Sequence, residues 1–365
     1  MTQASGARSF DTQAFAADLD ALKRRVREDL APEDLAHRSQ IAWWGRLCTL
    51  GGLATAWIVP NPLSVALLSL GTFTRWTMIA HHTLHRGYDH VPGAKPHQTS
   101  RKFAQGWRRW VDWLDWIEPE AWAHEHNQLH HYRLGEVADP DLLEHNVQWM
   151  RESSWPMWAR YAVVGFFMLT WKWSYYAPNT LRAKLKSNRS LFGMWSLPAF
   201  WLRCVLPYGL FRFAVLPLLF LPLGPVAVGS VLVNLLLAEF LTNFHSFVVI
   251  VTNHAGGDLH RFADPMADKA EFYRRQVVGS TNFRTGGMIN DFLHGWLNYQ
   301  IEHHLFPDLP MRQLARIQPE VEALCTKHGL TYVQESVWVR LRKTVAIAVG
   351  EASMRAEAPL VGDPA

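Results

Sequence analysis

The sequence is dominated by five long, mostly apolar runs, each close to the length of a membrane-spanning helix. A helix of roughly 20 apolar residues spans the hydrocarbon core of a bilayer. The runs therefore predict an all-α integral membrane protein in which several helices cross the membrane. They cover residues 41–59, 63–80, 155–176, 197–221 and 226–251.

The composition narrows the class of protein further. The 365 residues include 18 Trp, a side chain that collects at membrane interfaces, where its ring is buried and its N–H stays wet. The net charge of +4 is mild, and no block of Lys and Arg alternates with aromatic residues, so nucleic-acid binding is not expected. The isolated cysteines Cys48, Cys204 and Cys325 form no C-x-x-C motif, which argues against a disulfide framework and a structural zinc site.

The first two apolar runs are predicted to form a hairpin whose outer ends lie in the cytosol. The turn at residues 60–62, Pro-Asn-Pro, carries no charge, whereas the basic triplet at residues 23–25 precedes the hairpin. Loops rich in Lys and Arg tend to stay on the cytosolic side. We therefore expect residues 1–40 to be a cytosolic segment with a short helix, and His81 to lie where the second span leaves the membrane.

Residues 86–123 are polar but rich in tryptophan. Five Trp follow one another at intervals of three, three, three and six residues, which keeps most of the indoles near one stripe of a helix. With basic residues beside them, the pattern predicts an interfacial helix lying on the membrane; a helix in a soluble core is the alternative. The residues are Trp107, Trp110, Trp113, Trp116 and Trp122, with Arg101, Lys102, Arg108 and Arg109 beside them.

Half of the histidines gather in three short windows. The chain has 18 His, and nine of them lie in residues 81–85 (HHTLH), 124–131 (HEHNQLHH) and 303–304 (HH). Imidazole in such numbers indicates a metal site. Elsewhere, His37, His97, His145 and His328 stand alone and are interpreted as structural.

The three windows can meet only if they lie on one side of the membrane. No predicted span separates the first window from the second, so both share a side. Between the second and the third window the chain must cross an even number of times. The turn at residues 221–225, Leu-Pro-Leu-Gly-Pro, joins runs 197–221 and 226–251 as a second hairpin. Run 155–176 is then predicted to be an interfacial or re-entrant helix.

The spacing within the windows suits metal ligation. His81 and His85 are four residues apart, which on a helix places both imidazoles on one face. His126 and His130 repeat this spacing, His131 turns to the neighbouring face, and His303 and His304 add two more candidates. Imidazole suits iron, copper and zinc, but about eight His exceed what one tetrahedral zinc can use. We expect two metal ions.

The windows, in this order and with long apolar hairpins between them, resemble the three histidine boxes of the membrane fatty acid desaturase family. The stretch Gln300-Ile301-Glu302-His303-His304 is similar to the third box of the front-end branch, in which Gln replaces the first His. The resemblance covers about residues 41–330. It implies four membrane spans in two hairpins, about 41–59, 63–80, 197–221 and 226–251, beneath a cytosolic His-rich cap.

The resemblance also implies a cofactor and a ligand set. Members of the family hold a non-haem di-iron centre that uses O2 and two electrons to dehydrogenate an acyl chain. A further ligand commonly comes from the cytosolic end of the fourth span. His254 occupies that place, and its rival His245 lies nine residues earlier, roughly 13 Å deeper in the membrane. The implied iron ligands are His81, His85, His126, His130, His131, His254, His303 and His304.

Six further residues are weaker candidates around the metal site. His82 is about 100° round a helix from His81 and is expected to be structural or to support the ligands. The second box is spaced H-x-x-x-H-H, one residue longer than the commonest form. His124 can therefore replace a ligand of this box if the helix register shifts. Gln300 can bind weakly, bind through water or orient a neighbour. The remaining candidates, which can accept hydrogen bonds from imidazole or be solvated surface acids, are Asp139, Asp141 and Glu302.

The function implied by the resemblance is desaturation of a fatty acyl chain linked to lipid, CoA or a carrier protein. A hydroxylase or related oxygenase acting on an alkyl chain, a carotenoid or a specialised metabolite is the alternative. The sequence has no G-x-G-x-x-G after a strand and no His-Pro-Gly-Gly motif, so we expect a separate ferredoxin or cytochrome as electron donor. Its predicted docking face is basic and includes Arg274, Arg275, Arg284 and Arg312.

Two other classes of protein fit less well. A membrane electron carrier with bis-His haem needs His pairs inside facing spans, and a metal transporter needs ionisable ligands near the midplane, where only Glu239 and His245 are available. Beyond the membrane domain, residues 314–328 have the pattern of an amphipathic helix. Residues 331–365 are expected to be a cytosolic tail, disordered after Met354.

Overall fold

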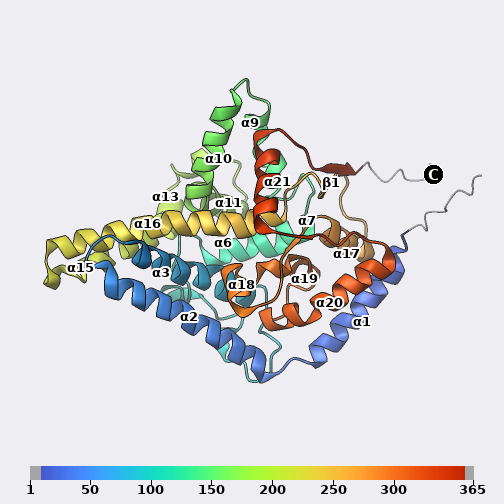
Figure 1. Ribbon diagram of the computed structural model, residues 1–365, viewed down its shortest axis with the longest axis horizontal. Helices are drawn as coiled ribbons and strands as arrows, with labels where there is room; N and C mark the ends of the chain where they lie inside the picture. The colour runs from blue at the N-terminus through green and yellow to red at the C-terminus, as the bar shows by residue number, and fades with distance from the viewer. Residues whose placement is uncertain (1–9, 358–365) are drawn as a thin grey trace, which may run out of the picture.

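The computed structural model describes residues 10–357. Helices make up most of the chain, in agreement with the all-α prediction. Long helices extend to one side of the molecule, and shorter helices gather at the other side, where the three histidine windows lie (Figure 1). This division separates an elongated apolar part from a compact cap.

The N-terminal part forms three helices in succession. The first, α1 (Thr12–Glu28), confirms the predicted short helix, and Asp11 caps it by accepting a hydrogen bond from the Ala14 N–H. It is followed by α2 (Pro32–Ala56) and α3 (Pro62–Phe73). Without a break, α3 continues through a π-helical segment, Thr74–Ala80, into α4 (His81–Leu84).

Helices α2 and α3 pack closely against each other, and their role as a hairpin in the membrane remains a prediction. A Cβ atom added at Gly52 would lie 2.7 Å from the side chain of Leu68, and one added at Gly71 would lie 2.1 Å from Thr49 Oγ1. Glycine therefore allows the two backbones to approach each other. At the turn, the Asn234 side chain donates to Ala56 O and accepts from the Asn61 N–H, both at 2.9 Å. A residue from a distant part of the chain thus holds the turn between α2 and α3 in place.

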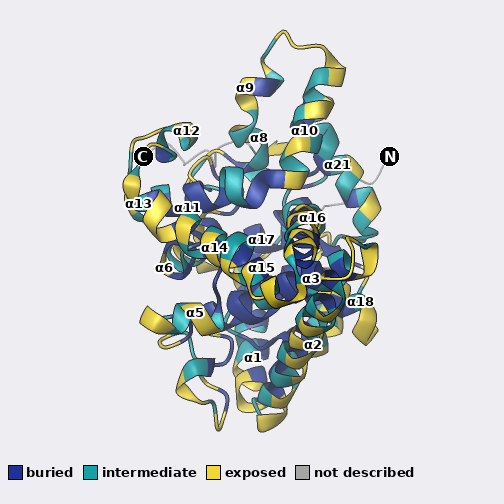
Figure 2. Cartoon of the chain, turned by 90° about the vertical axis from the view of Figure 1, so that its left-hand side faces the viewer, coloured by how far each residue is buried: buried dark blue, intermediate teal, exposed yellow. Residues whose placement is uncertain are grey.

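Three helical stretches of the described chain are long and apolar enough to cross a membrane: Pro62–Leu84, Pro198–Leu223 and Pro225–Asn253. They correspond to three of the four predicted spans. The run at 41–59 lies largely in α2, which is not among the three, so the fourth span remains a prediction. Exposed apolar side chains nevertheless line α2, including Trp43, Leu47 and Leu50, and Figure 2 shows exposed residues along α2.

The second apolar hairpin joins two of these stretches. Its first arm consists of α13 (Pro198–Phe200), α14 (Leu206–Leu210), α15 (Leu216–Leu218) and the helical segments between and after them. Its second arm is α16 (Pro225–Ile250). At the turn, Gly224 has a φ of +102°, a conformation that other residues rarely adopt. Glycine is required at this position.

The predicted interfacial helix within residues 86–123 is wrong. The segment is a chain of turns and short helices, with left-handed backbone at Gly106 (φ +57°) and Pro119 starting a new helix. Trp113 and Trp122 are buried, whereas Trp107 and Trp110 are 70% and 56% exposed. The regular spacing of the Trp residues therefore arises from a series of turns and short helices and not from one continuous helix. The helical pieces are Pro96–Gln98, Gly106–Arg108, α5 (Arg109–Asp112) and α6 (Pro119–His124).

Run 155–176 is helical and is not among the three span candidates, as predicted. It forms α10 (Met157–Trp171) and the π-helical segment Lys172–Tyr176, which leads into α11 (Ala177–Lys184). Helix α10 stands across α16 (Figure 1) and packs on it and on α21. Its location at the membrane interface remains a prediction.

The rest of the cap is built from short helices and two pairs of parallel strands. The strand pairs are β1 (His260–Phe262) with β4 (Arg355–Glu357) and β2 (Asn282–Phe283) with β3 (Gln334–Glu335). The predicted amphipathic helix is confirmed as α20 (Met311–His328). The other helices are α7 (His131–Arg133), α8 (Leu143–Asn146), α9 (Gln148–Arg151), α12 (Leu191–Met194), α17 (Lys269–Val278), α18 (Met288–Leu293), α19 (Gln300–Leu305) and α21 (Val337–Val349).

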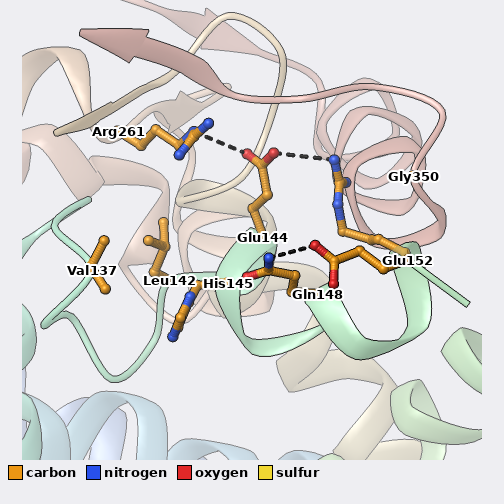
Figure 3. A pocket seen from close by; sticks show the side chains of 9 residues that line it. Val137, Leu142, Glu144, His145, Gln148, Glu152, Arg261 and Gly350 are labelled. Atoms are coloured by element: carbon orange, nitrogen blue, oxygen red, sulfur yellow. Dashed lines mark hydrogen bonds and ion pairs between the residues drawn. The ribbon is translucent and has the colours of Figure 1, made fainter. Parts of the chain in front are cut away.

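The expected disorder after Met354 is wrong for residues 355–357, because they form β4; residues 358–365 lie outside the described part. The tail folds back onto the cap. Glu144 accepts from the Met354 N–H at 2.9 Å and lies between Arg151 and Arg261 in a polar pocket next to this contact (Figure 3). Helix α21 contributes Arg340, which is fully buried.

Candidate metal centre

The first box lies at the cap end of the α3 helix. The π-helical segment before it ends with the His81 N–H bonded to Trp76 O, five residues back. His81 and His82 are in α4, and His85 ends it. All three are at most 4% exposed, so the apolar helix delivers the box directly into the protein interior.

The second box is also π-helical, over Glu125–His130. The His131 N–H bonds to His126 O, so one turn here holds one residue more than in an α-helix. This wider turn accommodates the long H-x-x-x-H-H spacing. The Asn127 side chain donates to Leu84 O at 2.9 Å and ties the second box to the first.

The third box lies in helix α19, and buried polar side chains hold this helix in place. Glu302 is fully buried and accepts hydrogen bonds from the Asn282 amide and the Tyr332 hydroxyl, both at 2.8 Å. Burial raises the pKa of Glu302 to about 7. These contacts correct one prediction, because Glu302 accepts from Asn282 and Tyr332 and not from an imidazole. It anchors the helix instead.

The windows meet, and their side chains form two groups. In the first group, one ligand atom from each of four buried histidines lies within 4.8 Å of all the others. His81 Nε2 and His303 Nε2 are 2.9 Å apart. Trp122 covers this group, with its ring stacked on His126 at 4.6 Å. We call these residues the first group: His81, His85, His126 and His303.

The second group takes one histidine from each of three segments. His130, His254 and His304 place one ligand atom each within 4.8 Å of one another. His254 follows directly after the helical turn Val251–Asn253 that extends α16. His126, His130 and Asp141 also place one ligand atom each within 4.8 Å of one another. Because this set contains one histidine from each group, it connects the second group to the first.

His131 lies between the two groups. Its ring stacks on that of His304 at 4.2 Å with an interplanar angle of 9°, and it is 4.4 Å from the ring of His85. The structure thus brings together all eight histidines that were proposed as ligands.

The weaker candidates fall into different places. His82 is buried beside the first group, with its ring 5.4 Å from that of His303. His124 pairs with Gln128 at 2.8 Å outside both groups. His245, the rival of His254, contacts Leu293 O through its Nε2 at 2.7 Å and is also outside.

Gln300 lies at the second group with its amide nitrogen towards it. The Asn253 side chain lies 3.2 Å from Gln300 Oε1, and Gln300 Nε2 lies 2.9 Å from His254 Nε2. An amide nitrogen has no lone pair to offer a cation. The arrangement therefore fits the expectation that Gln300 orients a neighbour.

Two acids of the 139–141 segment lie beside His130. Asp139 Oδ1 accepts from His130 Nδ1 at 2.9 Å, as predicted for a carboxylate that fixes a tautomer. Asp141 lies 3.9 Å from the same nitrogen, and burial raises the pKa of Asp141 to about 6. Burial opposes protonation of His130, but Asp139 outweighs it and the pKa of His130 is raised.

The other imidazoles are held neutral. Burial, strengthened by neighbouring imidazoles, lowers the pKa of the histidines outside the spans well below the usual value, so that a lone pair is available at neutral pH. This applies to His85, His126, His131, His254, His303 and His304.

Many of these nitrogens are buried without a hydrogen-bond partner, which is costly in a folded protein. A metal ion satisfies several such atoms at once, and a donor set of imidazoles suits iron, copper or zinc. The residues therefore fit a centre of two metal ions. The nitrogens are His85 Nε2, both of His126, both of His131, His254 Nδ1, His303 Nδ1 and His304 Nε2.

Sequence reasoning missed two residues of this site. Glu125 is fully buried between box residues, and burial first, then Asp141 and Asp139, raise its pKa well above the usual value. Its place next to His126 was the available signal. Gln276 on α17 bonds to both the second and the third box, and no motif marks it.

Three of the four arginines predicted to form a basic docking face are neutralised within the fold. Arg274 pairs with Glu271 and Glu357, and Arg275 with Glu136 and Glu271. Arg312 pairs with Asp34 at 3.2 Å. Arg284 is exposed, so the predicted face carries less free charge than its sequence suggests.

Comparison with known proteins agrees with this site. The family model described as fatty acid desaturase matches residues 55–336. The chain is 40% identical over 106 residues to the Delta(8)-fatty-acid desaturase of Euglena gracilis, covering 28% of this chain and 25% of that protein. It is 36% identical over 118 residues to the NADPH-dependent stearoyl-CoA 9-desaturase of Mycobacterium tuberculosis, covering 32% and 27%.

A longer match is to the acyl-lipid (7-3)-desaturase of Diacronema lutheri. The two are 32% identical over 238 residues, which cover 58% of this chain and 48% of that protein. The chain thus spans between about a quarter and a half of the length of these relatives.

Proposed function

Because this chain belongs to the fatty acid desaturase family, we propose that it uses O2 and two electrons to dehydrogenate a fatty acyl chain at two iron ions. When bound, iron supplies the oxidising chemistry that breaks an unactivated C–H bond, which side chains alone do not provide. The tasks of the protein are to hold the metal, position the chain and exclude water.

The observation that carries this proposal is the division of the histidines into two groups. The first group, His81, His85, His126 and His303, offers four nitrogens to one iron, and the second group, His130, His254 and His304, offers three to the other. His131 lies beside both groups and is the proposed eighth ligand. A single tetrahedral metal has no use for so many donors.

The surrounding residues support ligation in two ways. Asp139 holds a proton on His130 Nδ1, which leaves the Nε2 lone pair for metal. Trp122, buried against His126, shields the first group with an apolar surface, and exclusion of water strengthens the interactions inside the site.

The proposed topology has four spans in two hairpins with the site facing the cytosol. The stretches Pro62–Leu84 and Pro225–Asn253 both end at the metal site, and the hairpin turns at their other ends lie far from it (Figure 1). In this proposal α2 completes the first hairpin as the remaining span. The basic triplet at residues 23–25 favours a cytosolic N-terminal side.

The acyl carrier and the donor are proposed by class. Relatives are named for acyl-lipid and stearoyl-CoA substrates, so lipid-linked and CoA-linked chains are the leading candidates, with carrier-protein-linked chains as a third. Electrons are proposed to come from a separate ferredoxin or cytochrome.

Expression in a host with a suitable reductase, followed by mass spectrometry of total lipids with localisation of double bonds, tests the proposal. New unsaturated acyl chains are the expected product. A hydroxylated chain would instead establish an oxygenase of the same superfamily. Protein purified without oxygen should contain two irons per chain. Protein that binds no iron would overturn both the desaturase proposal and the oxygenase alternative.

A further inference from the structure

Gln276 connects two of the histidine boxes from an element that belongs to neither. It lies on α17 (Lys269–Val278) and is 1% exposed. Its Nε2 donates to the backbone oxygen of His131 at 3.2 Å, and its Oε1 lies 2.8 Å from His304 Nδ1. One side chain thus contacts the second box and the third.

Chemistry settles the orientation of this amide. A backbone oxygen only accepts hydrogen bonds, so the group facing His131 O must be the NH2. The carbonyl oxygen therefore faces His304, and because it too only accepts, His304 Nδ1 must carry the proton. The lone pair of His304 is then on Nε2, a buried nitrogen without a hydrogen-bond partner, and Nε2 is the nitrogen left for the second group.

We propose that Gln276 is a positioning residue of the metal centre, which fixes the tautomer of His304 and sets the spacing between the second and third boxes. The proposal rests on metal ligation by the two groups. Because the ring of His131 stacks on that of His304 at 4.2 Å, holding the backbone of one and the imidazole of the other restrains both rings where the two groups meet.

The helix that carries Gln276 is itself well held. Asp268 caps α17 by accepting from the Glu271 N–H at 2.8 Å, and Arg275, the residue before Gln276, pairs with Glu136 at 3.2 Å. Tyr273 donates to Asp20 on α1 at 2.7 Å. Gln276 is thus presented to the two boxes from a fixed support, as precise placement of an imidazole requires.

Two substitutions separate the effects of the two hydrogen bonds that the Gln276 amide makes. Gln276→Leu removes both hydrogen bonds, whereas Gln276→Glu keeps an acceptor for His304 Nδ1 and loses the donor to His131 O. The readouts are iron per chain and the Mössbauer spectrum of anaerobically purified, ⁵⁷Fe-loaded protein. Gln276→Leu is expected to bind one iron about tenfold or more weakly, so that iron per chain falls from two towards one. Gln276→Glu is expected to restore the iron and to change the spectrum of one iron only.

Gln313→Leu is the matched control. Gln313 is also 1% exposed, but its amide donates to both oxygens of Asp34, at 3.0 and 2.9 Å, away from the boxes. This variant should lose thermal stability and keep two irons with an unchanged spectrum. The same iron loss in Gln313→Leu would show that any buried amide has this effect and would overturn the proposal.

A wild-type spectrum with two irons in Gln276→Leu would also overturn it. If Gln276→Leu does not accumulate, Gln276→Glu decides, and a spectrum identical to that of the wild type would count against the proposal. Absence of iron from the wild-type protein would instead contradict the proposed function, so the two failures are distinguishable.

Discussion

At the scale of single residues, the histidines of the two groups differ in what holds their second nitrogen. In the second group, Asp139 accepts from His130, Gln276 accepts from His304 and the Gln300 amide lies 2.9 Å from His254 Nε2. In the first group, His85 Nε2, His303 Nδ1 and both nitrogens of His126 are buried without a hydrogen-bond partner. The second group is therefore oriented by hydrogen bonds and the first mainly by packing.

Asp139→Asn should weaken the second group in particular. The amide keeps the size of the carboxylate but removes the charge that holds the proton on His130 Nδ1. Loss of such a partner typically costs about 10- to 100-fold in metal affinity. Iron retained against a competing chelator measures the effect. The control is Asp89→Asn, whose carboxylate accepts from Ser100; equal iron retention by both variants would contradict the role of Asp139.

His303→Ala should abolish turnover and lower iron per chain while the protein remains in the membrane. His303 belongs to the first group, where its Nε2 is 2.9 Å from that of His81. His254→Ala should lower iron in the second group. His245→Ala is the control, because His245 contacts Leu293 O instead of either group. Loss of iron from the His245 variant alone would reverse the assignment.

The ligand windows are predictable from the sequence because the spacing within a helix fixes which side chains share a face. Asp139 was predictable for the same local reason, since it follows the second box by only eight residues from His131. Gln276 was not, because its partners lie 28 and 145 residues away. Glu302 was assigned the wrong partner, because its position in the box does not reveal that Asn282 and Tyr332 approach from the other side.

At the scale of elements, the long apolar runs predicted helices correctly, whereas the regularly spaced tryptophans did not. A long apolar run has few alternatives to a helix in lipid, and both turns contain Pro, at residues 60–62 and 221–225. The Trp pattern of residues 107–122 depended on an unbroken helix, but α5 ends at Asp112 and Pro119 starts a new helix. The π-helical turns before and within the boxes were also outside prediction, since they differ from an α-helix by a single residue per turn.

Helix α21 has a role that its distance from the boxes conceals. Arg340, fully buried, pairs with Asp258 at 2.8 Å and donates to the backbone oxygens of Thr252 and Ala255, which flank His254. The helix therefore helps to fix the ligand supplied at the end of α16.

Arg340→Met should destabilise the protein by about 2 kcal/mol, because it removes a buried guanidinium that bonds to the Thr252 and Ala255 carbonyl groups, while Asp258 keeps Lys343 as a partner. It should also weaken iron binding through His254. Thermal unfolding and iron content measure the two effects. Arg342→Met, at an exposed position on the same helix, should change neither. A Tm for Arg340→Met within the error of the wild-type value would contradict this role.

At the scale of the whole molecule, the candidate metal centre is built from segments that lie far apart in the chain. The boxes arrive from α4, α6–α7 and α19, and His254 from the end of α16. Burying so many imidazoles without hydrogen-bond partners destabilises the fold until a ligand satisfies them.

Removal of iron should therefore lower the Tm of the purified protein. A ligand that binds only the folded state at 100 times its Kd contributes about 2.7 kcal/mol per site. Chelation followed by readdition of iron should lower and then restore the Tm. The His303→Ala variant should respond less than the wild-type protein. An identical Tm with and without iron would show that the groups are stable unloaded.

The parallel pairing of β1 with β4 and the contacts of Arg340 have a consequence for the order in which the protein matures. Arg340 lies 85 residues after Ala255, and β4 follows still later in the chain. In the proposed topology, the apolar helices are synthesised before Arg340 and β4, which hold the cap. If the two groups bind iron as proposed, we therefore expect secure loading only after the C-terminal helix has packed on the cap.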